Sequence, residues 1–242
     1  MSNRGQGVGP RGAASDAGIP YRWQAADTFL SVAGISGHVN LANGNLLSVV
    51  HLSDFGGLSQ VSFDLFYNST DAGMSTVGGW RHSYSDTLEY VNDNTRIWTT
   101  SDGRLVTFTK EDSTWNAPSG VRLELMYNLA PDEWTVTDKG HNQRVFDGSG
   151  GELLRVLNDA GNPLNMSYDG SGRLETITQP LVIAHGIDAN KIEISYDCNG
   201  RIDEIALPRI TNPGEILMPL IGRTMEMQYD AEGRLRDSAQ IT

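Results

Sequence analysis

The chain has 242 residues, a formal net charge of −12 and a pI of about 4.7. Such an acidic composition argues against a general binder of nucleic acids or anionic membranes, and the lack of a long apolar run argues against a membrane span. The single cysteine, Cys198, cannot form an internal disulfide, and 27 glycines favour a fold with many turns.

Residues 1–33 are expected to be a disordered tail and entry segment, because residues 1–18 show no hydrophobic periodicity. No signal peptide is recognisable there, which leaves the cellular location unknown. A Gly-x-Gly-x-x-Gly string at residues 7–12 follows no strand and contains Pro10, so it is not interpreted as a dinucleotide site.

Residues 34–145 are predicted to form an N-terminal β domain. Apolar and polar residues alternate at 61–67 and again at 121–127, which is typical of strands with one buried face. Hairpins are expected about Asn43-Gly44 and about residues 138–140, where turn-forming residues separate apolar runs. No amphipathic helix of ten or more residues is found.

A further hairpin is expected at residues 95–109, with its turn at Asp102-Gly103. The predicted pairing sets Thr99 against Val106 and Ile97 against Phe108.

Residues 146–242 carry a repeated motif that ends in Tyr-Asp-x-x-Gly-Arg followed by Leu or Ile. Three copies lie at 164–174, 192–202 and 225–235, and a worn copy, one residue longer, lies at 146–153. Aspartate suits the first position of a type I turn, and glycine suits a positive φ at the fourth position. Each copy is therefore predicted to be a β-hairpin.

After three of the turns an apolar residue recurs three positions later, in the pairs Leu174 and Ile177, Ile202 and Ile205, and Leu153 and Val156. The runs are too short for helices, so bulged strands are predicted. One hairpin buries too little apolar surface to offset its ordering, so the copies are expected to pack on one another, with insertions at about 181–190 and 209–222. The residues that define the copies are Phe146, Asp147, Tyr168, Asp169, Gly172, Arg173, Leu174, Tyr196, Asp197, Gly200, Arg201, Ile202, Tyr229, Asp230, Gly233, Arg234 and Leu235.

These repeats resemble the rearrangement-hotspot (Rhs) or YD-repeat family, and residues 37–145 resemble the N-terminal module of that family. The motifs are Val-Asn-x-x-x-Gly-Asn at 39–45, Tyr-Asn-Ser at 67–69, Gly-Gly-Trp-Arg-His-Ser-Tyr at 78–84 and Asp-Gly-Arg at 102–104. Within them the residues singled out are Asn43, Gly44, Tyr67, Asn68, Trp80, His82, Tyr84, Asp102 and Gly103.

The resemblance implies an all-β fold of antiparallel hairpins stacked into a curved sheet or β-spiral. In large members of the family the repeats enclose or present an effector in bacterial competition or at a cell surface. This chain has few repeats, and it lacks the family's self-cleaving segment and a distinct C-terminal effector domain. It is therefore expected to be the opening part of such a shell, or a decayed or stand-alone short member of the family, and the resemblance implies a secreted or cell-surface location.

Nothing in the sequence predicts catalysis, a metal site or a cofactor. The five histidines are not at metal-ligand spacings, and no nucleophile elbow or phosphate loop is found. The expected function is a non-catalytic structural and interaction module, whose partners are further repeats, an effector domain or a second chain at the C-terminal edge strand. The alternative is a cell-surface adhesin or carbohydrate-binding module, with Trp98 and Trp115 as the candidate ligand face.

Overall fold

The computed structural model describes residues 28–32, 35–39, 45–55, 61–69, 80–180, 191–207, 223–231 and 235–241. Within these ranges the chain is all-β with antiparallel pairing, which confirms the predicted fold class. The described residues include no helix, and so none that could cross a membrane. The predictions for residues 1–18, Asn43, Gly44, 181–190, 209–222, Gly233 and Arg234 lie outside the described residues.

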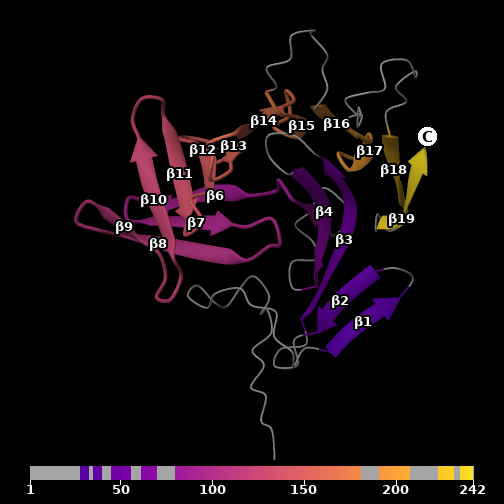
Figure 1. Ribbon diagram of the computed structural model, residues 1–242, viewed down its shortest axis with the longest axis horizontal. Coiled ribbons are helices and arrows are strands. Elements are labelled where there is room, and N and C mark those ends of the chain that lie inside the picture. The colour runs from indigo at the N-terminus through magenta and orange to yellow at the C-terminus, as the bar shows by residue number, and fades with distance from the viewer. Residues whose placement is uncertain are drawn as a thin grey trace, which may run out of the picture.

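The first sheet has five strands in sequence order (Figure 1). They are β1 (Thr28–Val32), β2 (Ile35–Val39), β3 (Leu46–Phe55), β4 (Val61–Asn68) and β5 (Trp80–His82). Val39 pairs with Leu46, so β2 and β3 are antiparallel neighbours on either side of the turn expected about Asn43-Gly44, which itself lies outside the described residues. Alternation in β4 buries Phe63 and Leu65, as the period-two pattern predicted.

The second sheet has fourteen strands, again in sequence order. The first eight are β6 (Thr87–Asn92), β7 (Thr95–Thr99), β8 (Leu105–Glu111), β9 (Thr114–Asn116), β10 (Leu123–Asn128), β11 (Glu133–Asp138), β12 (Gln143–Asp147) and β13 (Leu153–Leu157). The remaining six are β14 (Pro163–Tyr168), β15 (Leu174–Thr178), β16 (Lys191–Tyr196), β17 (Ile202–Leu207), β18 (Arg223–Tyr229) and β19 (Leu235–Ile241). The predicted domain boundary at 145/146 falls inside β12 of this continuous sheet, and the division into two domains stays a prediction.

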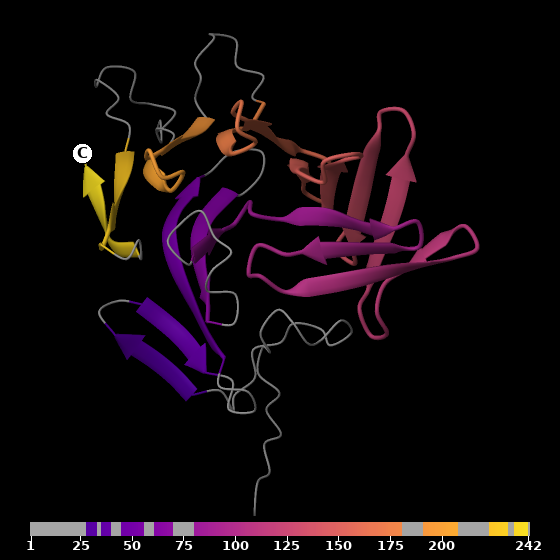
Figure 2. The ribbon, with the colours of Figure 1, turned by 180° about the vertical axis from the view of Figure 1, so that it is seen from behind.

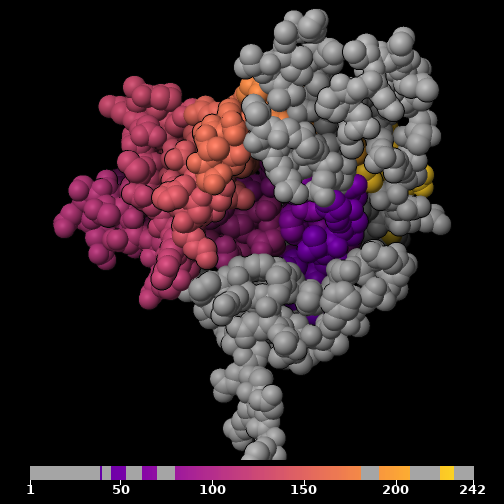
Figure 3. Space-filling view, in the orientation of Figure 1, coloured from indigo at the N-terminus to yellow at the C-terminus, as the bar shows by residue number. Residues whose placement is uncertain are grey.

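Strands β6 to β13 curl until the two ends of this part meet; we call them the curled part. The backbone N–H of Leu88 in β6 donates to the carbonyl of Gly151 at 2.9 Å, and Thr87 forms a bridge with Glu152. Strands β14 to β17 then arch over β3 and β4 (Figures 1 and 2). The space-filling view shows the curled part as one block beside the surface of the first sheet (Figure 3).

One hydrophobic core joins both sheets. It contains Phe63 and Leu65 from β4, Phe108 from β8 and Phe146 from β12. It then follows the repeats through Leu153, Leu164, Leu174, Ile177, Ile192, Ile194, Ile202, Ile205, Met225 and Met227. The first sheet is thus packed against the inner face of the winding second sheet.

Among the described residues, one turn geometry recurs at five hairpins. In each five-residue turn, the backbone N–H of the first residue donates to the carbonyl of the fifth residue, and the N–H of the fourth residue donates to the carbonyl of the first. The turns are 100–104, 138–142, 158–162, 169–173 and 197–201. A positive φ falls at the fourth residue, which is glycine in four turns and His141 in the other. The worn copy closes one residue later, from Asp147 to Glu152, in agreement with its longer sequence.

This turn corrects the predicted register of the hairpin at residues 95–109. Thr99 pairs with Leu105 and Trp98 with Val106, one residue away from the predicted pairing. Thr100 and Arg104 close the hairpin, so three residues lie in the loop and Gly103 takes a φ of 82°. The shift by one residue places Trp98 on the face turned to the core.

The predicted bulges are present at every copy of the repeat. Tyr168 pairs with Leu174 but Ser167 pairs with Thr176, so Glu175 has no partner across the hairpin. The register shifts in the same way at Phe146, Tyr196 and Tyr229. Because the extra residue restores the inward direction, Leu174 and Ile177 are both buried despite their spacing of three.

Candidate functional site

A hydrogen bond from each tyrosine of the repeat joins it to the copy before. The hydroxyl donates to the backbone carbonyl of the first residue after the preceding turn. The pairs are Tyr168 to Leu153 at 2.8 Å, Tyr196 to Leu174 at 2.8 Å and Tyr229 to Ile202 at 2.5 Å. Consecutive copies therefore touch, which confirms the expected packing of repeats.

The aspartate of each complete, described turn orders both the turn and its arginine. Asp169 accepts the backbone N–H groups of Ser171 and Arg173 at 2.8 and 3.0 Å. It also accepts the Nε and Nη2 of Arg173 at 2.8 and 2.6 Å. This bonding, led by the arginine side chain, lowers the pKa of the Asp169 carboxyl. Asp197 and Arg201 repeat the arrangement.

The ordered arginine then contacts the tyrosine of the next copy. The guanidinium carbon of Arg173 lies 4.4 Å from the ring centre of Tyr196, and that of Arg201 lies 4.4 Å from the ring centre of Tyr229. Each such cation–π contact at a partly exposed site contributes about 0.5–1 kcal/mol. We call the aspartate, its arginine and the next tyrosine the repeat latch.

The worn copy forms only half of a latch. Its Asp147 accepts N–H groups from Ser149 and Gly150 within its own turn, and no arginine closes that turn. Phe146 stands in the place of the tyrosine and is fully buried. The carbonyl of Leu153 still accepts the hydroxyl of Tyr168, so the latches of the described residues begin here.

The motifs of the N-terminal module also meet in space. The Asn68 side chain donates to the carbonyl of Asp102 at 3.2 Å, which ties β4 to the turn that contains Gly103. The rings of Tyr67 and Trp80 lie 5.3 Å apart, and the Tyr84 hydroxyl donates to the carbonyl of Ser62 at 3.0 Å. These contacts hold together segments more than ten residues apart.

His82 is buried at the corner that leads from the first sheet to the second. Its Nδ1 accepts the backbone N–H of Tyr84 at 3.3 Å, and its ring stacks on Phe63 at 5.5 Å. Burial, together with the nearby Arg81 charge, lowers the pKa of His82 to about 3. A neutral imidazole packed in this way fits a structural role at this corner.

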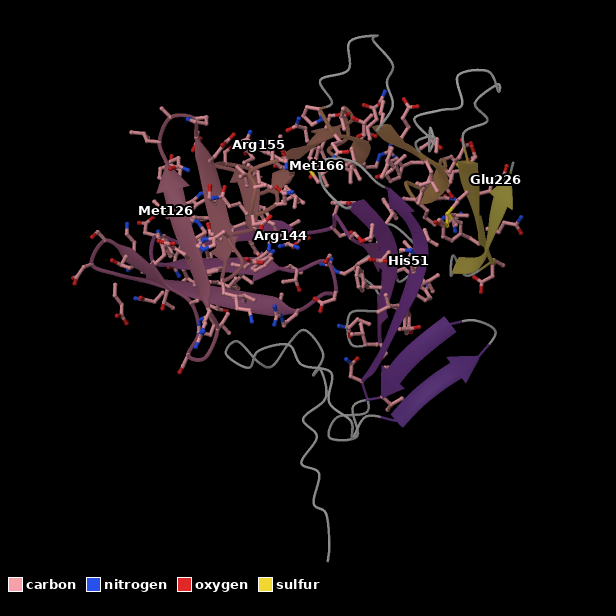
Figure 4. All side chains as sticks on the ribbon, in the orientation of Figure 1. His51, Met126, Arg144, Arg155, Met166 and Glu226 are labelled. Carbon is pink, nitrogen blue, oxygen red and sulfur yellow. The ribbon has the colours of Figure 1, made fainter. Side chains whose placement is uncertain are left out.

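Asp86 is a buried acid that sequence reasoning missed. One carboxylate oxygen, Oδ1, accepts the indole N–H of Trp98 at 2.8 Å and lies 3.3 Å from Nε of Arg144, which Figure 4 labels in the curled part. Burial raises the pKa of Asp86, while Arg144 opposes that rise. Asp86 lies in a polar loop between two short strands, and no local pattern distinguishes it from a turn aspartate.

The predicted ligand face is wrong for Trp98. Trp98 is 5% exposed because the observed register turns it inward, toward Val106 and Leu88. Trp115 is half-buried against Trp134, with ring centres 5.3 Å apart. The exposed aromatic residues nearby are Tyr90 and Tyr127, whose hydroxyls donate to Asp93 and Asp132.

Comparison with known proteins gives one family match and three similar proteins. Residues 36–108 match a family described as "Domain of unknown function (DUF6531)". A stretch of 142 residues is 28% identical to the "tRNA nuclease WapA" of Bacillus subtilis (strain 168). It is equally similar to the "tRNA(Glu)-specific nuclease WapA" of Bacillus subtilis subsp. natto and to the "tRNA3(Ser)-specific nuclease WapA" of Bacillus spizizenii. The match covers 57% of this chain and 6% of each relative.

Proposed function

We propose that this chain is a non-catalytic scaffold and interaction module of the Rhs or YD-repeat type. The repeat latch carries the proposal, because the two complete turns that the structure describes each supply the aspartate and arginine that receive the tyrosine of the next copy. Such a unit is useful as a winding wall that can present or enclose another protein. The family match at residues 36–108 supports the proposal, since it covers much of the N-terminal module.

The relatives are named as tRNA nucleases, and we propose that nuclease activity does not reside in the stretch that this chain shares with them. The shared stretch is 6% of the length of each relative. The polar groups of the repeats are used in turns and latches rather than gathered around a reactive atom.

The decisive experiment incubates the purified chain with total bacterial tRNA and follows the tRNA on denaturing gels. Intact tRNA at high protein concentration is the expected result. Cleavage that co-purifies with the chain and disappears in a variant of the Asp86 or His82 side chain would overturn the non-catalytic assignment.

A second experiment tests the scaffold itself, using latch variants of the full chain. Replacing Arg173 and Arg201 by Gln removes two latches and leaves the turns, because the aspartates retain their backbone partners. Loss of protease resistance in β16 to β19 is expected if the latches hold successive copies together. Unchanged digestion of these strands would count against the scaffold role.

The adhesin or carbohydrate-binding function remains a second proposal, supported by one surface. Tyr90 and Tyr127 are 57% and 43% exposed, and the guanidinium of Arg96 lies over the rings of Tyr90, Trp134 and Trp115. Aromatic rings beside hydrogen-bond donors suit sugar rings. A glycan array probed with the chain and with its Tyr127→Ala variant tests this, and binding that is equal in both would reject this surface.

A further inference from the structure

A cavity of about 220 Å³ lies where the first sheet leads into the second and faces the first two complete repeats. Strand β5 supplies Trp80 and the corner between β5 and β6 supplies Tyr84 and Asp86, while the repeats supply Tyr168, Arg173 and Tyr196. Glu152, from the turn of the worn copy, also lines it. Elements far apart in the chain therefore build one partly open chamber.

Asp86, which lines this cavity, carries an unsatisfied acceptor. Its side chain is 1% exposed, and its Oδ1 is used by Trp98 and Arg144. The second oxygen, Oδ2, is buried and receives no hydrogen bond from the described protein groups. An unmet buried acceptor costs about 1–3 kcal/mol, so a donor that enters the cavity has a physical reason to bind there.

Glu152 supplies a second carboxylate-bearing residue to the cavity lining. Thr87 forms a β-bridge with Glu152 where the two ends of the curled part meet, which we call its seam. This bridge places Asp86 and Glu152 on neighbouring segments. Among the described residues, Glu152 forms no ion pair. Of the two arginines that line the cavity, Arg173 is paired with Asp169 at 2.6 Å, whereas the charge of Arg81, like that of Arg144, opposes the burial-driven rise in the pKa of Asp86. The acidic side of the chamber is thus formed by Asp86 and Glu152.

The remaining walls suit a cation with an aliphatic stem. Trp80, Tyr84, Tyr168 and Tyr196 supply aromatic surface. The hydroxyls of Tyr84, Tyr168 and Tyr196 already donate to backbone carbonyls, so they can only accept further hydrogen bonds. Ring faces and acceptor oxygens are the groups that recognise an alkylammonium ion.

We propose that this cavity binds a primary ammonium group on an alkyl stem, with Asp86 and Glu152 as its carboxylate partners. A lysine side chain of a partner peptide and a small free amine both carry this group. A bound ammonium donates to Oδ2 of Asp86, and its stem packs on the rings of Tyr168 and Trp80. The site then lies beside the first latch, on the face where the two sheets meet.

The test is a titration of the ¹⁵N-labelled full chain, followed by the indole N–H signals of its five tryptophans. The Trp98 signal reports directly, because this N–H donates to Asp86. The probes are N-acetyl-lysine methylamide and n-butylammonium chloride, with N-acetyl-norleucine methylamide as an uncharged control. Saturable shifts at Trp98 with both charged probes are expected, and none with the control. A shift with the lysine probe alone supports a peptide ligand, and an equal response to both supports any alkylammonium.

Two variants make the test independent of folding problems at one site. Asp86→Asn is expected to abolish the response, whereas Glu152→Gln weakens the affinity about tenfold through one lost charge-assisted hydrogen bond. The matched control is Glu175→Gln, at an exposed position of β15 outside the cavity, and it retains wild-type binding. No saturable shift with either charged probe, an equal shift with the norleucine probe, or wild-type affinity in Glu152→Gln would each overturn the proposal.

Discussion

Gly151 is the residue at which a single added methyl group is expected to open the seam of the curled part. Its φ is +73°, and a Cβ built there would lie 2.1 Å from the carbonyl oxygen of Leu88 and 3.0 Å from the carbonyl carbon. The same glycine accepts the Leu88 N–H at 2.9 Å. Leu88 is buried, so neither strand can move outward without loss of core packing.

The expected loss for Gly151→Ala is about 3–5 kcal/mol of unfolding free energy. A non-glycine residue in the left-handed region costs about 1–2 kcal/mol. Breaking the Leu88 bond leaves a buried donor unmet, which costs about 1–3 kcal/mol, and displacement of the strand adds to it.

Two other glycines separate these contributions. Gly161 has a φ of +77° with nothing within 4 Å of an added Cβ, so Gly161→Ala is expected to cost only the backbone part, about 1–2 kcal/mol. Gly170 has open space and no positive φ, so Gly170→Ala is expected to be neutral or slightly stabilising. Urea unfolding followed by tryptophan fluorescence measures all three, compared at unchanged m-value. Equal losses in Gly151→Ala and Gly161→Ala would refute the steric reasoning.

Three further predictions concern a latch, a turn and a buried histidine. Tyr196→Phe leaves the Leu174 carbonyl without its donor and is expected to cost about 1–2 kcal/mol in urea unfolding, whereas Tyr127→Phe, which loses an exposed bond to Asp132, costs close to nothing. His141 holds a φ of 64° where the matching turns have glycine, so His141→Gly is expected to raise the unfolding free energy by about 1 kcal/mol; a decrease would contradict this. The His82 pKa is lowered from 6.5 to about 3, so the unfolded state binds the extra proton first. The contribution of His82 to the free energy of unfolding is therefore fully present above pH 6.5, and it falls by about 1.4 kcal/mol per pH unit as the pH drops below that value. His82→Asn is expected to flatten this slope between about pH 6 and 4.5, measured by urea unfolding at a series of pH values.

Local chemistry made the repeats readable from the sequence. Asp169 and Gly172 specify a turn within five residues, and the spacing of Leu174 and Ile177 already contains the bulge that turns both inward. Hydrogen bonds of this kind join residues near one another in the chain, so a short pattern records them. The division of the strands into a five-stranded and a fourteen-stranded sheet could not be predicted from such patterns, because no local signal marks the corner at His82 as the point where the chain changes sheet.

The amino-acid order by itself determined the all-β class, the hairpins and the tyrosine, aspartate and arginine positions of the repeat, since each follows from side-chain periodicity or turn preference over a few residues. Only the tertiary structure decided that Trp98 faces the core, that β6 closes on Gly151, and that Asp86 lies buried beside a cavity. Those outcomes depend on which distant segments pack together, and packing is set by the whole core rather than by any one stretch of chain.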